Sequence, residues 1–198
     1  VQIATMGQLN SADAVDLEGS DLFADAGGNE AVQIDSNGAT AQVIAGGNVD
    51  IDTGANAPAT SDIEIDGRIS ATGSAVTVAI DAVNSVTFGA DGDIILSGGG
   101  ASLVHVVADQ AGATTGVITM ADGALIDADD GQVEIIANST VTIGEIQTTT
   151  LVNLASFAAN IADADAGAGN DITAADLAIS GETGAVSYTH LTLPTRRG

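Results

Sequence analysis

Valine, isoleucine and leucine residues recur two positions apart in short runs along most of the chain, and small polar turns separate these runs. The pattern is clearest between Gly116 and Ser156, which contain the runs VITM (117–120), VEII (133–136) and VTI (141–143). Successive side chains of a strand point to opposite faces, so this alternation predicts short β-strands with one buried face. The turns are rich in Gly, Asn, Asp and Ser, which tolerate left-handed backbone or bind it through their side chains.

Successive runs begin about 8–14 residues apart, a spacing typical of sandwiches, barrels and solenoids. Internal similarity favours a solenoid, because residues 74–92 resemble residues 131–147 and residues 61–73 resemble residues 139–150. Strands of three to five residues are too short to form isolated hairpins, whereas stacked coils pair each strand above and below. We therefore predict an all-β fold, a parallel β-helix (β-solenoid) of short stacked strands with about seven coils of roughly 20–30 residues.

The alternation also predicts which side chains enter the core of this solenoid. We expect six residues to point into one continuous core: Ile63, Ile65, Val76, Val78, Val141 and Ile143. The residues between them, Glu64, Thr77 and Thr142, should point outward. A tandem β-sandwich is the alternative fold. It would favour longer strands and larger aromatic core residues, whereas aromatic residues form only 2% of this chain.

We interpret residues 1–185 as one solenoid segment, irregular over residues 1–30 and regular over about 31–185. Residues 186–198 differ in composition: Val186 to Thr195, VSYTHLTLPT, holds the single Tyr and contains no acidic residue. These ten residues match the translation of a transposon end and sequencing adapter, so we predict a non-native tail that adds no equivalent strand. We accordingly expect the natural protein to continue beyond both ends.

The charge excludes several classes of partner. The chain has 27 acidic and 3 basic residues, a formal net charge of −24, and no lysine. Binding to nucleic acid or to an anionic membrane needs clusters of Lys and Arg, so neither is expected. No apolar run approaches the ~18–20 residues of a membrane span. The chain contains no cysteine, which excludes disulfides and cysteine-based metal sites.

One segment has the composition of a calcium-binding loop. Residues 163–171, DADAGAGND, place oxygen ligands on a glycine-rich backbone, which suits a hard cation. Its candidate ligands are Asp163, Asp165, Asn170 and Asp171. The alternative is a solvated turn in an acidic chain. A second segment, DADDG (127–131), resembles the start of an EF-hand loop, but its twelfth position is Asn138 and its flanks are predicted strands.

No catalytic constellation is evident in the sequence. His105 lies in LVHVV (103–107), where alternation places it on the face opposite Val104 and Val106. Ser102 and Asp109 are nearby, but their spacing is not diagnostic of a triad, so we expect a strand histidine with a structural hydrogen bond. Some β-helices are carbohydrate-active enzymes. Because Arg68 is the single basic residue before the tail and aromatic residues are scarce, we do not expect catalysis or a resident cofactor.

Several repeats resemble those of filamentous-haemagglutinin-like bacterial surface proteins. The resemblance rests on DIEIDGRISAT (62–72), TVTIGEIQTT (140–149, with one gap), GDIILSGGGAS (92–102) and NDITAADLAISGETGA (170–185), and extends over roughly residues 48–185. It implies a secreted or cell-surface, outer-membrane-associated stalk or scaffold segment of an adhesin. The partners it implies are flanking repeats of the same chain and a surface or matrix component of a host or neighbouring cell. A calcium-stabilised extracellular module is the first alternative, and a carbohydrate-active β-helix is the second.

Overall fold

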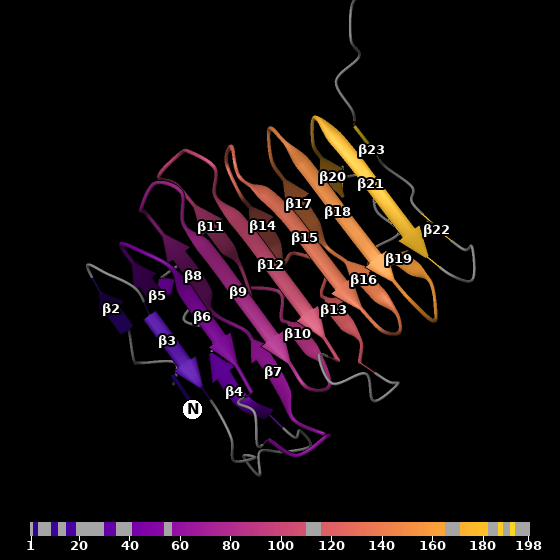
Figure 1. The fold of residues 1–198 in the computed structure, drawn as a ribbon, viewed down its shortest axis with the longest axis horizontal. Coiled ribbons are helices and arrows are strands. Elements are labelled where there is room, and N and C mark those ends of the chain that lie inside the picture. Colours follow the sequence, from indigo (N-terminus) through magenta and orange to yellow (C-terminus); the bar gives the residue numbers. More distant parts are fainter. Residues whose placement is uncertain are drawn as a thin grey trace, which may run out of the picture.

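Strands and turns form the whole of the described part of the chain. The structure is a computed structural model that describes residues 2–3, 9–11, 15–18, 30–34, 41–53, 57–109, 116–164, 171–181, 186–187 and 191–192. Its strands form three sheets, and each strand neighbours the strands that come three places before and after it in the chain. The colours of Figure 1 therefore advance in order from one end of the molecule to the other.

We name the three sheets A, B and C. Sheet A contains β1 (Gln2–Ile3), β4 (Glu30–Ile34), β7 (Asp62–Ile65), β10 (Val86–Phe88), β13 (Ile118–Met120), β16 (Val141–Ile143), β19 (Ile161–Asp163) and β22 (Val186–Ser187). Sheet B contains β2 (Leu9–Ser11), β5 (Ala41–Ala45), β8 (Arg68–Ala71), β11 (Ile94–Leu96), β14 (Leu125–Asp127), β17 (Glu145–Gln147), β20 (Ile172–Thr173) and β23 (Leu191–Thr192). Sheet C contains β3 (Val15–Glu18), β6 (Val49–Asp52), β9 (Thr77–Ala82), β12 (Leu103–Ala108), β15 (Gln132–Ala137), β18 (Leu151–Ser156) and β21 (Asp176–Gly181).

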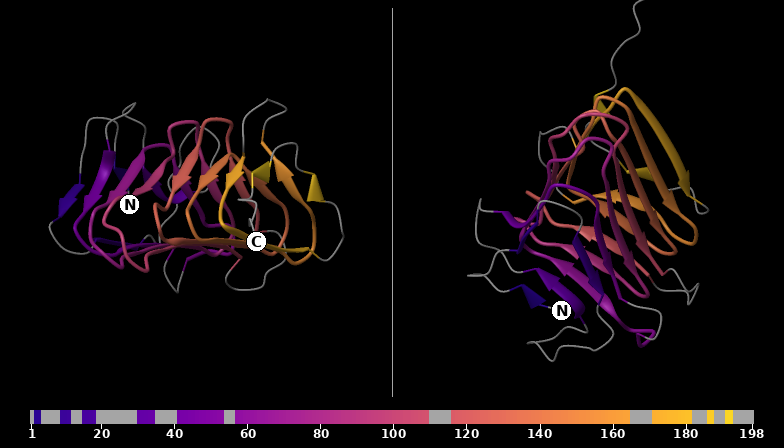
Figure 2. Two further views of the ribbon diagram at one scale, coloured as in Figure 1. Left: turned by 90° about the horizontal axis from the view of Figure 1, so that it is seen from above. Right: turned by 60° about the vertical axis from the view of Figure 1, so that its left-hand side comes forward.

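This topology is a parallel β-helix, which confirms the predicted fold class. Each coil contributes one strand to each sheet, so β1–β3 form the first coil and β19–β21 the seventh. Figure 2 shows the coils side by side along the long axis. Every strand pair in the described residues is parallel. The alternative sandwich is therefore wrong, because its strands would pair antiparallel.

The coils differ in length although the strands stay in register. One coil takes 32 residues, from Val86 to its partner Ile118, whereas another takes 20 residues, from Val141 to Ile161. The extra residues lie in the corners between sheets, where the backbone is free to lengthen without shifting a strand. The similarity between residues 74–92 and 131–147 has a structural basis, because β9 and β15 occupy sheet C while β10 and β16 occupy sheet A.

The core consists of rows of apolar side chains that run from coil to coil. In sheet C one row of fully buried residues is Ile51, Ile80, Val106, Ile135 and Leu154. The six residues predicted to face the core are all buried, which confirms that prediction: Ile63, Ile65, Val76, Val78, Val141 and Ile143. The intervening Glu64, Thr77 and Thr142 are partly exposed, as expected for outward positions.

Glycines line the corner between sheets B and C in three successive coils. A Cβ atom on Gly98 would lie closer than 3.0 Å to the carbonyl oxygen of Gly73, and one on Gly73 equally close to that of Gly46. Real Cβ atoms do not approach backbone oxygen this closely, so a side chain at either position would push neighbouring coils apart. These glycines are therefore needed for close stacking rather than for an unusual backbone conformation.

The two ends of the chain also join the stack. Although residues 1–30 are irregular in sequence, β1, β2 and β3 pair with β4, β5 and β6. The predicted tail differs from expectation, because β22 pairs with β19 and β23 pairs with β20 in parallel. These two strands are only two residues long, and they follow the register of the coil below them. The origin of residues 186–198 in an adapter stays a prediction.

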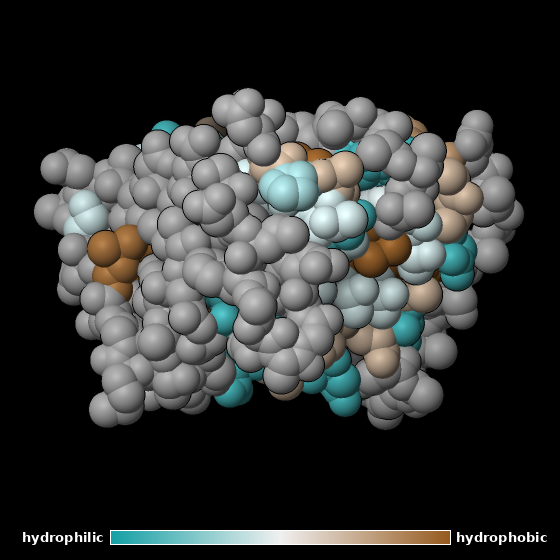
Figure 3. Space-filling model, turned by 90° about the horizontal axis from the view of Figure 1, so that it is seen from below, coloured by the Kyte–Doolittle hydropathy of each residue, from teal (hydrophilic) through white to brown (hydrophobic). Residues whose placement is uncertain are grey.

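The described surface mixes polar and apolar positions. On the face shown in Figure 3, the coloured residues of both kinds are interspersed rather than gathered into one apolar patch. No helix long and apolar enough to cross a membrane occurs among the described residues.

Candidate functional site

A chain of polar side chains crosses the outer face of sheet C. It contains Asp81 on β9, His105 on β12, Glu134 on β15 and Asn153 on β18, so it links four successive coils. Glu134 Oε2 lies 2.9 Å from His105 Nδ1, and Asn153 Nδ2 donates to Glu134 Oε1 at 3.0 Å. On the other side, His105 Nε2 lies 3.9 Å from Asp81 Oδ1. Because an ionised carboxylate only accepts hydrogen bonds, Nδ1 of His105 donates to Glu134.

His105 has the structural role that alternation predicted. It lies on the outer face of β12, between the buried Val104 and Val106. Its two sequence neighbours have other partners: Ser102 Oγ accepts a hydrogen bond from the backbone of Val76, and Asp109 Oδ2 accepts one from Asn138 Nδ2. The contacts of His105 described here are therefore to carboxylates on adjacent coils and not to a hydroxyl nucleophile.

Asp81 is the most perturbed acid of this outer face. Burial raises the pKa of its carboxyl above the ordinary value of 3.8, since partial loss of water disfavours the charged form. The positive field of His105 opposes this change, while the negative charges of Asp50 and Asp52 add to it. Asp52 lies directly opposite Asp81 in the sheet register, so the two carboxylates are neighbours on the stacked strands.

Replacing Asp81 with asparagine should stabilise the protein at pH 7 by on the order of 0.5–1 kcal/mol, because it removes a repelled, partly buried charge. The raised pKa means that the folded state holds the Asp81 proton more tightly than the unfolded state does. The wild type therefore gains stability as the pH falls from neutral through this titration, and the variant lacks that gain. Thermal melts should show the variant's advantage at pH 7 shrinking towards pH 4.

The control for this prediction is Asp122→Asn, which removes the same charge from an exposed turn. An equal rise in melting temperature for both variants at pH 7 would contradict the prediction, since it would assign the effect to net charge alone.

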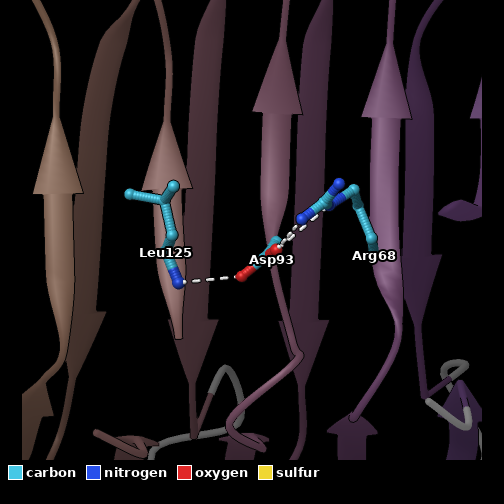
Figure 4. A network of polar contacts seen from close by, with 3 residues as sticks. All are labelled: Arg68, Asp93 and Leu125. Atoms are coloured by element: carbon cyan, nitrogen blue, oxygen red, sulfur yellow. Dashed lines mark hydrogen bonds and ion pairs between the residues drawn. The ribbon is translucent and has the colours of Figure 1, made fainter. Parts of the chain in front are cut away.

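Arg68 binds Asp93 at the beginning of sheet B strands. Arg68 Nε and Nη2 donate to Asp93 Oδ2 at 3.0 and 2.6 Å, and Asp93 Oδ1 accepts from the backbone amide of Leu125 at 3.2 Å. Figure 4 shows Asp93 between the other two residues, so one carboxylate links three coils. The Asp93 side chain is only 10% exposed, and a buried carboxylate of this kind needs both a cation and amide donors.

The candidate calcium loop is only partly described. Asp163 ends β19, and Asp171 lies directly before β20 and is buried. Asp165 and Asn170 lie outside the described residues. Asp163 pairs with Ile143, so it occupies the position that carries an apolar side chain in the coil before it. No group of three or more His, Asp or Glu side chains suited to a metal ion occurs among the residues the structure describes.

Calcium binding by this loop stays a prediction that melting curves can test. With so many unpaired acids, the melting temperature should rise with ionic strength, since salt screens repulsion between carboxylates on stacked strands. Millimolar calcium should add more than sodium chloride of matched ionic strength if the loop binds it, by about 2.7 kcal/mol when calcium exceeds the Kd a hundredfold. Asp163→Asn and Asp165→Asn should abolish this increment. An increment that survives both substitutions would exclude this loop as the site.

The DADDG segment forms a tight turn between β14 and β15. Asp129 has a positive φ of 54°, and its backbone amide donates to Asp127 Oδ1 at 3.1 Å. Asp130 Oδ2 accepts from the amide of Gly100, in the corner of the preceding coil, at 3.0 Å. These two carboxylates therefore bind backbone amides at a corner of the solenoid.

The C-terminal end of the stack exposes apolar side chains. Phe157 is 55% exposed and Ile179 is 36% exposed. A groove of about 320 Å³ lies here, lined by Ser156, Phe157, Ser180 and Gly181. Sequence analysis did not identify this surface, because Ile179 has the same alternation as the buried residues of earlier coils. Its exposure follows only from its place on the last strand of sheet C.

Comparison with known proteins places these features in no established group. No protein-family model, no curated protein and no solved structure matches the chain.

Proposed function

We propose that this chain is a structural stalk segment of a secreted or cell-surface bacterial adhesin-like repeat protein. The observation that carries the proposal is the unbroken register of three parallel sheets through seven coils. Each coil adds about 4.8 Å of length along the axis, the spacing of paired strands. Such a rod extends by adding coils, and each coil contacts only its neighbours.

The surface chemistry supports the same function. A net charge of −24 keeps rods in solution and apart from one another, and extracellular salt screens the repulsion within each rod. The resemblance of repeats such as residues 62–72 to filamentous-haemagglutinin-like proteins points in the same direction. In this proposal the segment holds a binding region away from the cell and has no catalytic role. Flanking repeats adjoin it, and the adhesin contacts a surface or matrix component of a host or neighbouring cell.

The proposal is tested in the bacterium that carries the gene. Antibodies raised against the purified chain should label intact cells, and external protease should remove the label while a cytosolic marker stays intact. Labelling that requires cell lysis, with full protection from external protease, would overturn the proposal. Electron microscopy of the released protein should then show rods rather than compact particles.

A further inference from the structure

The last strand of sheet C is paired on one edge only among the described residues. In β21, Leu177 and Ile179 are in register with Val152 and Leu154, which are fully buried. They belong to the inward rows of the core, yet Ile179 is 36% exposed and Leu177 is partly exposed. A further strand of the same kind would bury both side chains, as β21 itself buries those of β18.

The strand at the opposite end of sheet C has the required sequence. In β3, Val15 and Leu17 are in register with Val49 and Ile51, so they stand in the same two inward rows as Leu177 and Ile179. The β3 strand is four residues long and pairs in parallel with β6. We propose that the C-terminal end of the solenoid binds the N-terminal end of a second copy, with β3 of that copy added in parallel to β21.

The charges on the outer face suit this pairing. Continuing the register places Asp16 and Glu18 of the second copy opposite Ala178 and Ser180. No carboxylate therefore faces another across this row, in contrast to the first two coils, where Asp16 stands opposite Asp50 and Glu18 opposite Asp52. The acidic end of sheet C meets its neutral end.

The other two sheets continue in the same way. The first coil of the second copy brings β1, β2 and β3, which are two, three and four residues long. Its β1 and β2 take the places of β22 and β23 on β19 and β20, where those strands pair through two residues each. The exchange gains strand pairing and covers the apolar groove beside Phe157. Such a head-to-tail contact does not close, so it gives linear chains of copies.

Sedimentation velocity on the full chain tests this proposal with two end-blocking variants. Ile179→Lys places a charge in the C-terminal contact, and Leu17→Lys places one in the N-terminal contact. The wild type should show a sedimentation coefficient that rises with concentration, more strongly in 0.5 M than in 0.05 M sodium chloride because the copies repel. Each variant alone should stay monomeric. An equimolar mixture should form a 1:1 dimer and nothing larger, since one free end of each kind remains.

The matched control is Ala178→Lys, on the outer face of the same strand. It should strengthen association at low salt at least twofold, because the new lysine would face Asp16 of the next copy. Circular dichroism checks that each variant folds, and Ile179→Thr replaces Ile179→Lys if the latter does not. A monomeric wild type at every concentration and salt would overturn the proposal. So would a monomeric mixture, or Leu17→Lys dimers, which would mean tail-to-tail contact.

Discussion

Replacing Ile135 with alanine should lower the free energy of unfolding by about 2–5 kcal/mol, the range for large-to-small changes at buried sites. Ile135 is fully buried, and its row neighbours on the adjacent coils are Val106 and Leu154. In a stack held in register by strand pairing, neighbouring coils have little freedom to close a cavity. The loss should therefore fall in the upper part of that range. Urea unfolding followed by circular dichroism measures it.

The neighbouring Ile136 is the matched control, because it is the same residue type on the outer face of the same strand. Ile136→Ala should cost about 1 kcal/mol or less, since this side chain keeps part of its contact with water. Equal losses for the two variants would contradict the inward and outward assignment of β15. A larger loss for Ile136 would reverse it.

Replacing Gly98 with alanine should destabilise the protein by about 2–3 kcal/mol or more, the upper part of the range for overpacking. The added methyl group would overlap the carbonyl oxygen of Gly73 in the coil below. Backbone atoms of two paired coils cannot move apart at one corner without weakening the strands on both sides. The expected result is a lower melting temperature with an unchanged strand content at 20 °C.

Gly181→Ala is the control for this substitution. A Cβ atom at Gly181 would meet nothing closer than 3.8 Å, so the change should stay within about 0.5 kcal/mol of wild type. If Gly98→Ala melted at the same temperature as Gly181→Ala, the close approach at the corner between sheets B and C would be wrong.

The fold could be predicted from the sequence because two signals agreed. The two-residue alternation assigned the inward positions, such as Ile63 and Val141, and the internal similarity indicated that equivalent strands stack. What the sequence could not supply was the register of each coil, since the corners add a variable number of residues. Coils of 20 and 32 residues occur in the same stack.

The same variation explains why side-chain partners were missed. In a solenoid the neighbours of an outward side chain lie one coil away, so His105 contacts Glu134 and Asp81 rather than Ser102 or Asp109. Arg68 was recognised only as an isolated base, and its partner Asp93 lies 25 residues further along the chain. Such contacts become predictable only after the register is known. The four calcium ligands illustrate the converse, since closeness in sequence was the whole basis for grouping them.

The variable coil length has a mechanical consequence. The hydrogen bonds between coils run along the long axis, so tension on the two ends pulls coils apart at an end, one after another. A released coil of 20–32 residues extends to roughly 70–110 Å at about 3.4 Å per residue, in place of about 4.8 Å while stacked. Each peeled coil therefore lengthens the molecule by more than ten times its folded contribution. Under load the rod behaves as a store of slack, and coils with long corners release more of it than short ones.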